Sequence, residues 1–474
     1  FIFMKTNRIA FFIIAAFFVV SCASHYQRTL LFQEKLSNGE LDKASAILEK
    51  DRQLKKNKNR LLYLMNKGYL EHLMGNFTES NKFFDEADLH MEDQRKDLAS
   101  EALALISNPE VKPYKAEDFE RVLVNYYKAI NFLEQGAYDE AIVECKRINL
   151  LLQTLNDKYS NKKNKYSDDA FSHIVMGLIY DSRKNYNDAF IAYRNAYEIF
   201  KRDESNAYMG TVMPEQLKKD LLRTAYLVGV YEDQRFYEKA FGYKYKHEEN
   251  THGDLIFFWQ NGLGPVKDDW SINFSIVKGA AGNIFFENEE LGLSFTFPAG
   301  STSGNGNFGD LSLIRVAFPK YVERKPFYNN ANITINNKSY PLEEAEDINH
   351  IAFECLNDRF LREMSNSLLR LAIKQSSEAL LKEKNEELGA LLSIVNAVTE
   401  KADTRNWQSL PYNISYTRVP LAEGDNTIYL NKTRGNEQDQ DEFHFDGKAG
   451  QTQFFLHHSL ESMPMSNQNT QFYN

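Results

Sequence analysis

The sequence has little of what metal centres and disulfide frameworks need. Only three cysteines occur in 474 residues, and none belongs to a CxxC or Cys/His spacing, which argues against a cysteine-rich scaffold or a zinc motif. Cys145 and Cys355 lie among apolar residues in stretches expected to be helical. Two buried free thiols are favoured there, with a disulfide as the alternative in an oxidising compartment. We therefore expect neither a metal nor a cofactor.

Motifs that announce catalysis are also missing. The sequence contains no G-x-S-x-G and no H-E-x-x-H. Gly304–Gly309 fits GxGxxG, but an expected strand follows it instead of the helix that dinucleotide binding requires. His457 and His458 fall in an expected strand, where neighbouring side chains face opposite sides and cannot readily share one ion. No catalytic residue is predicted.

Basic residues are the minority among the charged ones. Lysine and arginine number 56 against 66 acidic residues, for a net charge of −10, which argues against a nucleic-acid partner. The acidic pair Asp268-Asp269 lies beside Trp270, and a glycosidase needs two opposed carboxylates with an aromatic platform. Adjacent carboxylates are more often a solvated turn, so an enzyme is the weaker interpretation.

Beyond residue 21 no apolar run is long enough to cross a membrane, but the N-terminus is different. Lys5 and Arg8 precede the wholly apolar stretch Ile9–Val20, which has the length of a signal-peptide core. Val19-Val20-Ser21-Cys22 then matches the bacterial lipobox, in which the cysteine thiol is the nucleophile that receives diacylglycerol. The alternatives are an ordinary secretory signal with an incidental cysteine and an uncleaved anchor helix. We expect residues 1–21 to be a signal peptide and Cys22 to carry several acyl chains, which hold a protein stably on a membrane.

The residues after Cys22 bear on the location of the protein. Ala23 and Ser24 follow the cysteine, and no aspartate comes directly after it to favour retention at the inner membrane. No acidic run follows that would favour export to the cell surface. We expect an outer-membrane lipoprotein that faces the periplasm.

Residues 22–246 are expected to form helical repeats of the tetratricopeptide type, with a period near 34 residues. The best copy is Ala170–Phe200, where Gly177, Ala189 and Ala196 let two antiparallel helices approach and aromatic residues fill the space between them. Weaker copies lie at Tyr126–Ile148, Leu64–Leu89 and Gly39–Leu48, and Pro214–Phe241 closes the stack with a poor match. Stacked helical pairs form a solenoid whose concave face commonly binds a peptide or protein. The alternative is that the solenoid is only a spacer or a docking platform for the second half.

Residues 247–474 are expected to form a β-sandwich-like domain with an inserted helical hairpin at about 343–401. Short β-branched and aromatic runs broken by Gly, Pro and Asn indicate the strands: Leu255–Trp259, Ser271–Ile276, Asn283–Glu287, Leu293–Phe297, Leu311–Phe318, Asn332–Ile335, Ser339–Leu342, Asn413–Pro420, Thr427–Leu430 and Gln453–His457. In the insertion, the charged stretch Lys382–Glu387 separates a first helix from a second at Leu388–Val398. The hairpin is expected to pack on the sheet or the repeats, with a partner-binding element as the alternative. The predicted fold class is therefore α+β.

Three dense strings are not explained by this fold alone: Trp259–Lys267, Arg315–Tyr321 and Ala402–Pro411. Together with Asp220-Leu-Leu-Arg223 and the repeat at 170–200, they resemble an uncharacterised family of bacterial tetratricopeptide-repeat lipoproteins. The resemblance covers nearly the whole chain after residue 21. It implies a cell-envelope location and, weakly, a link to cell-wall synthesis, and it transfers no activity and no catalytic residue.

Five residues are candidates for an interaction site or a structural motif. Asp403, Arg405 and Trp407 can form an ion pair capped by an indole, which would join the second helix of the insertion to the next strand. Trp259 and Trp270 are expected to anchor the first sheet. For these residues a structural role is favoured over a ligand site.

The leading functional hypothesis is a membrane-anchored, non-catalytic scaffold that binds another envelope protein through the repeat groove or the helical hairpin. The alternative is a module of the β domain that binds glycan or peptidoglycan, or less readily processes it, with Trp259, Trp270 or Trp407 in the site. The repeats favour the first hypothesis. The absence of well-spaced paired carboxylates from the sequence weighs against processing.

Overall fold

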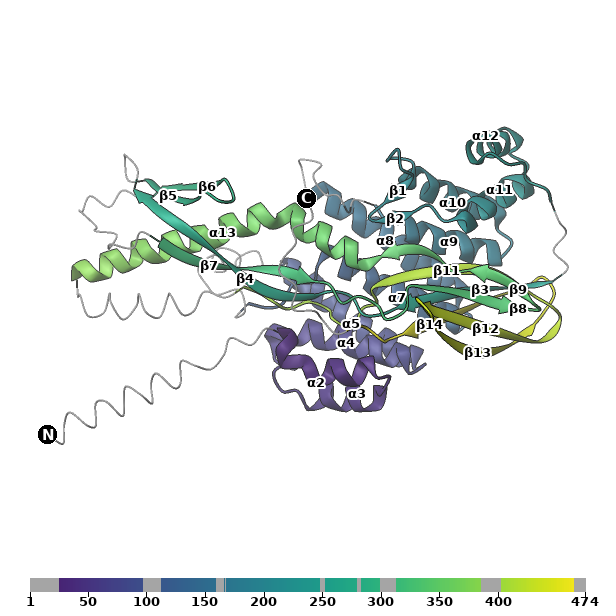
Figure 1. Ribbon diagram of the computed structural model, residues 1–474, viewed down its shortest axis with the longest axis horizontal. Coiled ribbons are helices and arrows are strands. Elements are labelled where there is room, and N and C mark those ends of the chain that lie inside the picture. The colour runs from purple at the N-terminus through teal and green to yellow at the C-terminus, as the bar shows by residue number, and fades with distance from the viewer. Residues whose placement is uncertain are drawn as a thin grey trace.

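The structure is a computed structural model that describes residues 25–96, 112–158, 166, 168–247, 252–278, 283–298, 313–384 and 402–463. The first part consists of antiparallel helical pairs, and the second part consists mainly of strands (Figure 1). The fold is therefore α+β, with tetratricopeptide-like helices followed by a β-rich region, as the sequence predicts.

Five helical pairs lie in the described part of the first half, each with a first and a second helix. The pairs are α2 (His25–Ser37) with α3 (Leu41–Lys50), α4 (Arg60–Leu73) with α5 (Phe77–Lys96), α7 (Asp118–Glu134) with α8 (Tyr138–Lys158), α9 (Ala170–Ser182) with α10 (Tyr186–Phe200), and α11 (Glu215–Val228) with α12 (Tyr231–Phe241). A short 3-10 helix η1 (Asn57–Asn59) precedes α4, and a small hairpin of β1 (Ala207–Tyr208) and β2 (Thr211–Val212) precedes α11. The poor motif match at Pro214–Phe241 is thus still a helical pair.

Glycine opposite an aromatic ring sets the close approach within two of the pairs. A Cβ atom at Gly177 would lie 2.4 Å from the Tyr193 ring, and one at Gly68 would lie 2.9 Å from the Phe84 ring. In both pairs the ring lies sixteen residues after the glycine, since 193 − 177 = 84 − 68 = 16. This is the role that the sequence predicts for Gly177.

Residues with a left-handed backbone end the first helix of each pair. They are Gly39, Gly75, Gly136, Lys184 and Gly229, with φ between 60° and 80°. Glycine adopts this conformation without the clash that a Cβ atom causes, and only the fourth pair uses another residue. The recurrence of this turn is the clearest sign that the five pairs are copies of one unit.

Two four-stranded sheets pack face to face as a β-sandwich. The strands are ordered β10-β11-β3-β14 in one sheet and β13-β12-β8-β9 in the other. Their bounds are β3 (Gly253–Asn261), β8 (Asn330–Ile335), β9 (Lys338–Pro341), β10 (Glu343–Asp347), β11 (Asn413–Leu421), β12 (Gly424–Arg434), β13 (Glu437–Gly447) and β14 (Thr452–Ser459). Strand β3 is central, antiparallel to β11 and parallel to β14, so that Phe257 is opposite both Thr417 and Phe455.

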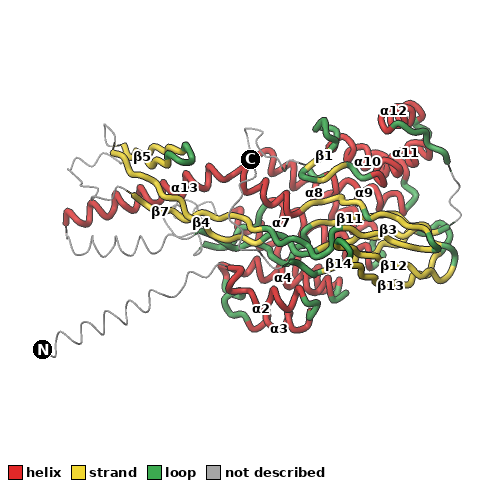
Figure 2. Tube along the Cα trace, viewed as in Figure 1, coloured by secondary structure: helices red, strands yellow, loops and turns green. Residues whose placement is uncertain are grey.

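Strand β3 is buried on both faces, which explains its unbroken apolar run. Leu255 and Phe257 point into the core shared by the two sheets. Ile256 and Phe258 point the other way, into the large core of the helices. The molecule therefore has three layers, helices against a sheet against a second sheet, and Figure 2 shows β11 and β3 between α9 and the strands β12 and β13.

The third sheet and one long helix form an arm that projects from the repeats (Figure 1). The sheet has the order β6-β5-β4-β7, with β4 (Val266–Lys278), β5 (Asn283–Asn288), β6 (Leu293–Pro298) and β7 (Leu313–Val322). Helix α13 (Ile348–Lys384) packs on it through Met364 and Leu368, against side chains such as Phe274 and Phe318.

Two expectations about the second half need correction. The insertion does not begin as a helix, because 343–347 is strand β10 and the helix starts at Ile348. Its described part is one helix of 37 residues that ends at Lys384, and the expected second helix Leu388–Val398 lies outside the described residues. The sequence also misses β13, the edge strand of its sheet, whose exposed positions carry polar or charged side chains, as is common at a sheet edge.

Candidate functional site

The first helix of every pair faces the second half of the chain, and this shared surface is called the junction below. Almost every residue of α4, α7 and α9 is buried, although a helix at a solvated surface would bury only one side. The first helices meet two elements there: the sheet with β3 at its centre and the extended segment 402–411, whose residues from Thr404 to Leu410 are all buried. The face of the repeats that commonly receives a ligand is thus covered by the chain itself.

The start of the segment is held by hydrogen bonds to helix α2. The backbone N–H of His25 donates to Thr404 Oγ1 at 2.8 Å. Thr29 Oγ1 and Gln33 Nε2 donate to Gln408 Oε1 at 3.0 and 3.2 Å. These bonds join residues more than 370 positions apart, so they exist only when both halves are in place.

Asp403 and Arg405 form an ion pair with Arg405 Nη2 2.6 Å from Asp403 Oδ2. Arg405 Nη1 also donates to the backbone carbonyls of Lys58 and Lys112, each at 3.0 Å. The guanidinium lies over the Tyr114 ring, 5.5 Å from its centroid. The pair therefore joins the segment to the loops before α4 and α7. The ring over the cation is that of Tyr114 and not the indole of Trp407, which corrects the predicted arrangement.

Trp407 fills an aromatic cluster on the repeats. Its side chain is 1 % exposed, and its ring lies 5.9–6.2 Å from those of Tyr69, Phe84 and Tyr127. The indole Nε1 donates to Ser409 Oγ at 2.9 Å. No face of this indole is open to a ligand, so Trp407 serves as a core residue that packs the segment against the repeats.

A buried carboxylate pair at the start of α7 closes the other side of the junction. Glu117 forms ion pairs with Lys267 of β4 and Arg359 of α13. Glu120 accepts the backbone N–H of Trp407 at 2.7 Å and the Tyr114 hydroxyl at 2.5 Å. Four separate parts of the chain meet at these two residues.

The surroundings shift the pKa values of the two carboxylates in opposite directions. Burial alone would raise the pKa of Glu117, but the charges of Arg359 and Lys267 lower it to about 2. Burial and the nearby charge of Glu117 raise the pKa of Glu120 to about 7. Such a split is found at catalytic sites, but here both groups are enclosed by protein and their partners belong to the junction.

A second ionic network explains the string Asp220-Leu-Leu-Arg223. Arg418 of β11 lies 2.6 Å from Asp181 and 3.0 Å from Asp220, and Arg223 also pairs with both aspartates. Burial opposes ionisation of Asp181, but the charges of Arg418 and Arg223 lower its pKa. The network joins α9 and α11 to the sheet.

The other two tryptophans also have protein partners. Trp259 is 2 % exposed in the sandwich core, and its Nε1 donates to Ser459 Oγ at 3.0 Å. Trp270 stacks on Phe360 of α13, with ring centroids 6.0 Å apart. The five candidate residues thus lie in three places, and only Asp403, Arg405 and Trp407 share one.

The remaining sequence candidates are placed as follows. Cys22 and Gly304–Gly309 lie outside the described residues. His457 faces the sandwich and Asp441, whereas His458 faces the repeats and lies 2.6 Å from the Tyr69 hydroxyl. Cys145 and Cys355 are free. In the described ranges no three His, Cys, Asp or Glu side chains are grouped to hold a metal ion, and no helix has the length and hydropathy of a membrane span.

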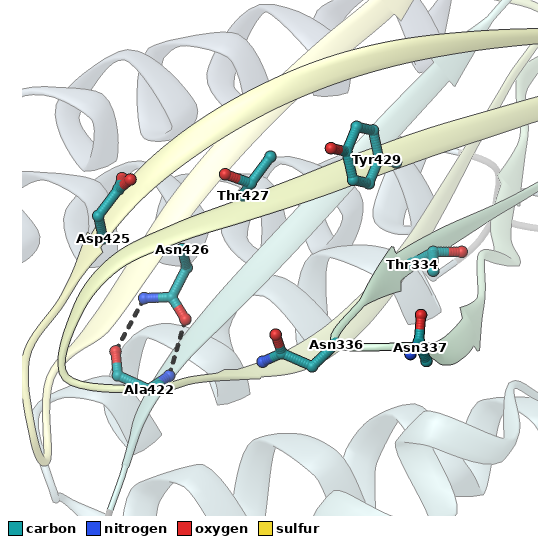
Figure 3. Close-up of a pocket in the computed structure, with 8 residues that line it drawn as sticks. All are labelled: Thr334, Asn336, Asn337, Ala422, Asp425, Asn426, Thr427 and Tyr429. Carbon is teal, nitrogen blue, oxygen red and sulfur yellow. Dashed lines mark hydrogen bonds between the residues drawn. The ribbon is translucent and has the colours of Figure 1, made fainter.

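An open hollow of about 420 Å³ lies on the outer sheet, away from the junction (Figure 3). Its lining is almost wholly polar: Thr334, Asn336, Asn337, Ala422, Asp425, Asn426, Thr427 and Tyr429. The Asn426 amide is already used, because it bonds to both the N–H and the carbonyl of Ala422. Figure 3 shows Asn336 and Asn337 on the opposite wall from Asn426.

Sequence reasoning missed the residues that complete the junction. Arg324 is buried and donates to the Gly264 carbonyl at 2.6 Å and to Gln33 Oε1 at 2.8 Å. Gln260 of β3 bonds to the hydroxyls of Tyr69 and Tyr127 at 2.9 and 3.0 Å. Gln260 lies in the string Trp259–Lys267, which was the available signal, whereas Arg324 lies outside all three strings and had none.

Comparison with known proteins places the chain only coarsely. No protein-family model matches it, and no curated protein matches it. Among solved structures, the apo form of RapI matches 45 % of this chain and 52 % of its own length, at 15 % identity and a TM-score of 0.34. MamA matches 47 % of this chain and 96 % of its own (16 %, TM-score 0.28). Nearly identical TPR-like repeats of a putative kinesin light chain from Podosopora anserina match 45 % of this chain and 93 % of their own length, at 15 % identity and a TM-score of 0.29.

Proposed function

We propose that this protein is a lipid-anchored, non-catalytic scaffold of the bacterial cell envelope that binds another envelope protein. The lipobox ending at Cys22 supports the anchor, and the exposed apolar residues on the outer face of the tetratricopeptide-like repeats support the scaffold. The buried acids and bases of the junction support a non-catalytic role, because each serves a contact between parts of the chain. A periplasmic location on the outer membrane and a link to cell-wall synthesis complete the proposal and rest on the residues after Cys22 and on the family resemblance.

One observation carries the proposal furthest: the inner face of the repeats is occupied by the chain itself. A partner that binds the repeats therefore has to use the outer face, which the second helices form. Exposed apolar residues lie there, namely Leu89, Val143, Leu150 and Ile191, together with Tyr231 and Phe236 of α12. Counted from the equivalent positions Gly68, Ala129 and Gly177, Leu89 and Leu150 share one position of the repeat, since 89 − 68 = 150 − 129 = 21. Val143 and Ile191 share another, since 143 − 129 = 191 − 177 = 14. Recurrence at equivalent positions marks this outer face as the surface for the partner.

Site-specific photo-crosslinking in cells tests the scaffold. A photoreactive residue in place of Leu89 or Leu150 is expected to capture one protein, whereas the same residue in place of Leu361, which is exposed on the arm, is the matched control. Recovery of nothing beyond the general lipoprotein machinery from Leu89 and Leu150 would contradict the proposal.

Fractionation tests the anchor. Cys22→Ser is expected to release the protein from the membrane or to stall its processing, because serine lacks the thiol that accepts the lipid. Unchanged attachment to the membrane would rule the lipid anchor out.

The polar hollow favours a second candidate function, the binding of glycan or peptidoglycan. Its hydroxyl and amide groups, with the Tyr429 ring, are of the kinds that bind sugars. Trp259 and Trp407 cannot serve, because both are buried. The full chain should then be retained on isolated peptidoglycan, and Asn337→Ala with Thr427→Ala should weaken retention. Equal passage of wild type and variant through the material would eliminate this function.

A further inference from the structure

We infer that the surface around the start of helix α2, with the basic loop at residues 52–58, lies against the anionic phospholipid surface that holds the anchor. The inference rests on the proposed lipidation of Cys22 and adds an orientation to it. It names one membrane-facing side of the molecule and the charges that hold it there.

Only a short stretch of chain joins the proposed lipid anchor to helix α2. Cys22 precedes His25 by three positions in the sequence, and three residues span at most about 11 Å. His25 is part of the folded body, because it is buried and its N–H bonds to Thr404. A lipid on Cys22 therefore holds the start of α2 close to the bilayer, whatever the rest of the chain does.

Basic residues gather at this place in an otherwise acidic protein. Thr404, which bonds to His25, is next in sequence to Arg405, and Arg405 bonds to the carbonyls of Lys58 and Lys112. Hydrogen bonds thus connect the start of α2 to the loop that carries Arg52, Lys55, Lys56 and Lys58, of which the first three are exposed. The chain as a whole has a net charge of −10, so the loop marks one side as cationic.

Helix α2 adds an apolar pair on its outward side. Leu30 is 48 % and Leu31 57 % exposed, whereas Thr29 and Gln33 face the junction. Two leucines flanked by cationic residues suit the boundary between headgroups and acyl chains. Each lysine or arginine near an anionic surface adds to the attraction, and the effect fades within a Debye length of about 8 Å.

Helix α12 provides a matched control. It lies at the opposite end of the stack of helical pairs from α2 (Figure 1), and Lys244 and Lys246 just after it are exposed. Lys55→Glu with Lys56→Glu changes the charge as much as Lys244→Glu with Lys246→Glu does. Only the first pair lies on the inferred membrane side.

The experiment uses the lipidated full chain in vesicles of phosphatidylethanolamine with phosphatidylglycerol. A fluorophore is placed on the cysteine of Leu31→Cys, or of Leu150→Cys as the control, with Cys145→Ala and Cys355→Ser in the background, and energy transfer to a labelled lipid headgroup reports proximity. Transfer is expected to be several-fold higher from position 31, to fall in K55E/K56E and not in K244E/K246E, and to fall in vesicles of phosphatidylcholine alone.

Equal transfer from the two positions, or transfer from position 31 that does not change in K55E/K56E, would overturn the inference. Only membrane-attached protein is measured, so this outcome leaves the lipid anchor standing. The proposed lipid anchor is tested separately by fractionation, where continued membrane attachment of Cys22→Ser would rule it out.

Discussion

At the scale of single residues, the junction is held by side chains that have partners on both sides of it. Trp407 belongs to the segment 402–411, but its ring contacts belong to α4, α5 and α7. Glu120 belongs to α7, yet it accepts the N–H of Trp407. Neither residue has an obvious purpose in its own half of the chain.

Trp407→Ala should therefore lower the free energy of unfolding of the whole protein by about 3–5 kcal/mol, the usual loss for a large aromatic residue removed from a core. Denaturant unfolding followed by circular dichroism measures it. Trp270→Ala is the control, because Trp270 is only partly buried and should cost clearly less. Similar losses in both variants would mean that the aromatic cluster is not a main support of the junction.

The stability of the folded protein is expected to depend on pH through Glu344 of β10. Burial and the nearby Asp347 raise the pKa of Glu344 to about 7. Above the unfolded value near 4.5 the unfolded chain loses this proton first, so the folded state is progressively disfavoured as the pH rises from 4.5 to 7.

Glu344→Gln removes this titration and should stabilise the protein relative to wild type by about 1–3 kcal/mol more at pH 8 than at pH 4.5. Unfolding free energies at the two pH values test it, with Glu442→Gln, an exposed carboxylate of β13, as the control. A difference that is constant between the two pH values would contradict the expected sign.

At the scale of elements, the sheet completes the helices as much as it packs on them. Helix α11 starts after Pro214, which has no side-chain cap of its own. The carboxylate of Glu343 in β10 supplies it, by accepting the N–H groups of Glu215 and Gln216 at 3.0 and 2.8 Å. An N-terminal carboxylate satisfies free N–H groups and suits the helix dipole, so a strand 128 positions away caps the last pair.

Arg418 ties strand β11 to helices α9 and α11 through Asp181 and Asp220. Arg418→Met is expected to cost about 3–5 kcal/mol, because it leaves Asp181 and Asp220 buried with one cation fewer. Thermal unfolding compares it with Lys448→Met, a change at a 61 % exposed lysine that should have little effect. A loss no larger than that of the control would show that the network contributes nothing net.

At the scale of the whole molecule, the large hydrophobic core is shared between repeats and sheet. It runs from Phe32 of α2 through Tyr127 of α7 to Tyr416 of β11 and Leu460. A boundary near residue 247 separates helix from strand in the sequence, but it does not separate two independent cores.

The repeats and the sandwich should accordingly unfold in one transition. All three tryptophans lie in the second half, whereas most helical signal comes from the first. Tryptophan fluorescence and far-ultraviolet circular dichroism should give the same denaturant midpoint. Trp270 lies on the arm, so the test is repeated in Trp270→Phe. Two separate midpoints in that variant would show that the halves are independent units.

The sequence by itself determined the local structure of this protein. The spacing of Gly177 and Tyr193 decides how two helices meet, and the run Leu255–Trp259 decides that β3 is covered on both sides, because each depends on residues close in the chain. The three dense strings could be recognised for the same reason, because each is a short run of neighbouring residues. The residues that they contact could not be predicted from the strings themselves.

Only the tertiary structure decided that the repeats receive their own chain instead of a free ligand. The contact of Trp407 with Tyr69, the pairing of Arg418 with Asp181 and the cap that Glu343 gives α11 each join residues more than 120 positions apart. No local period or propensity encodes such a pair. Such a pair forms only because the helices, the sheet and the segment 402–411 bury one another. For the same reason the face predicted to be an open groove is buried in the middle of the molecule.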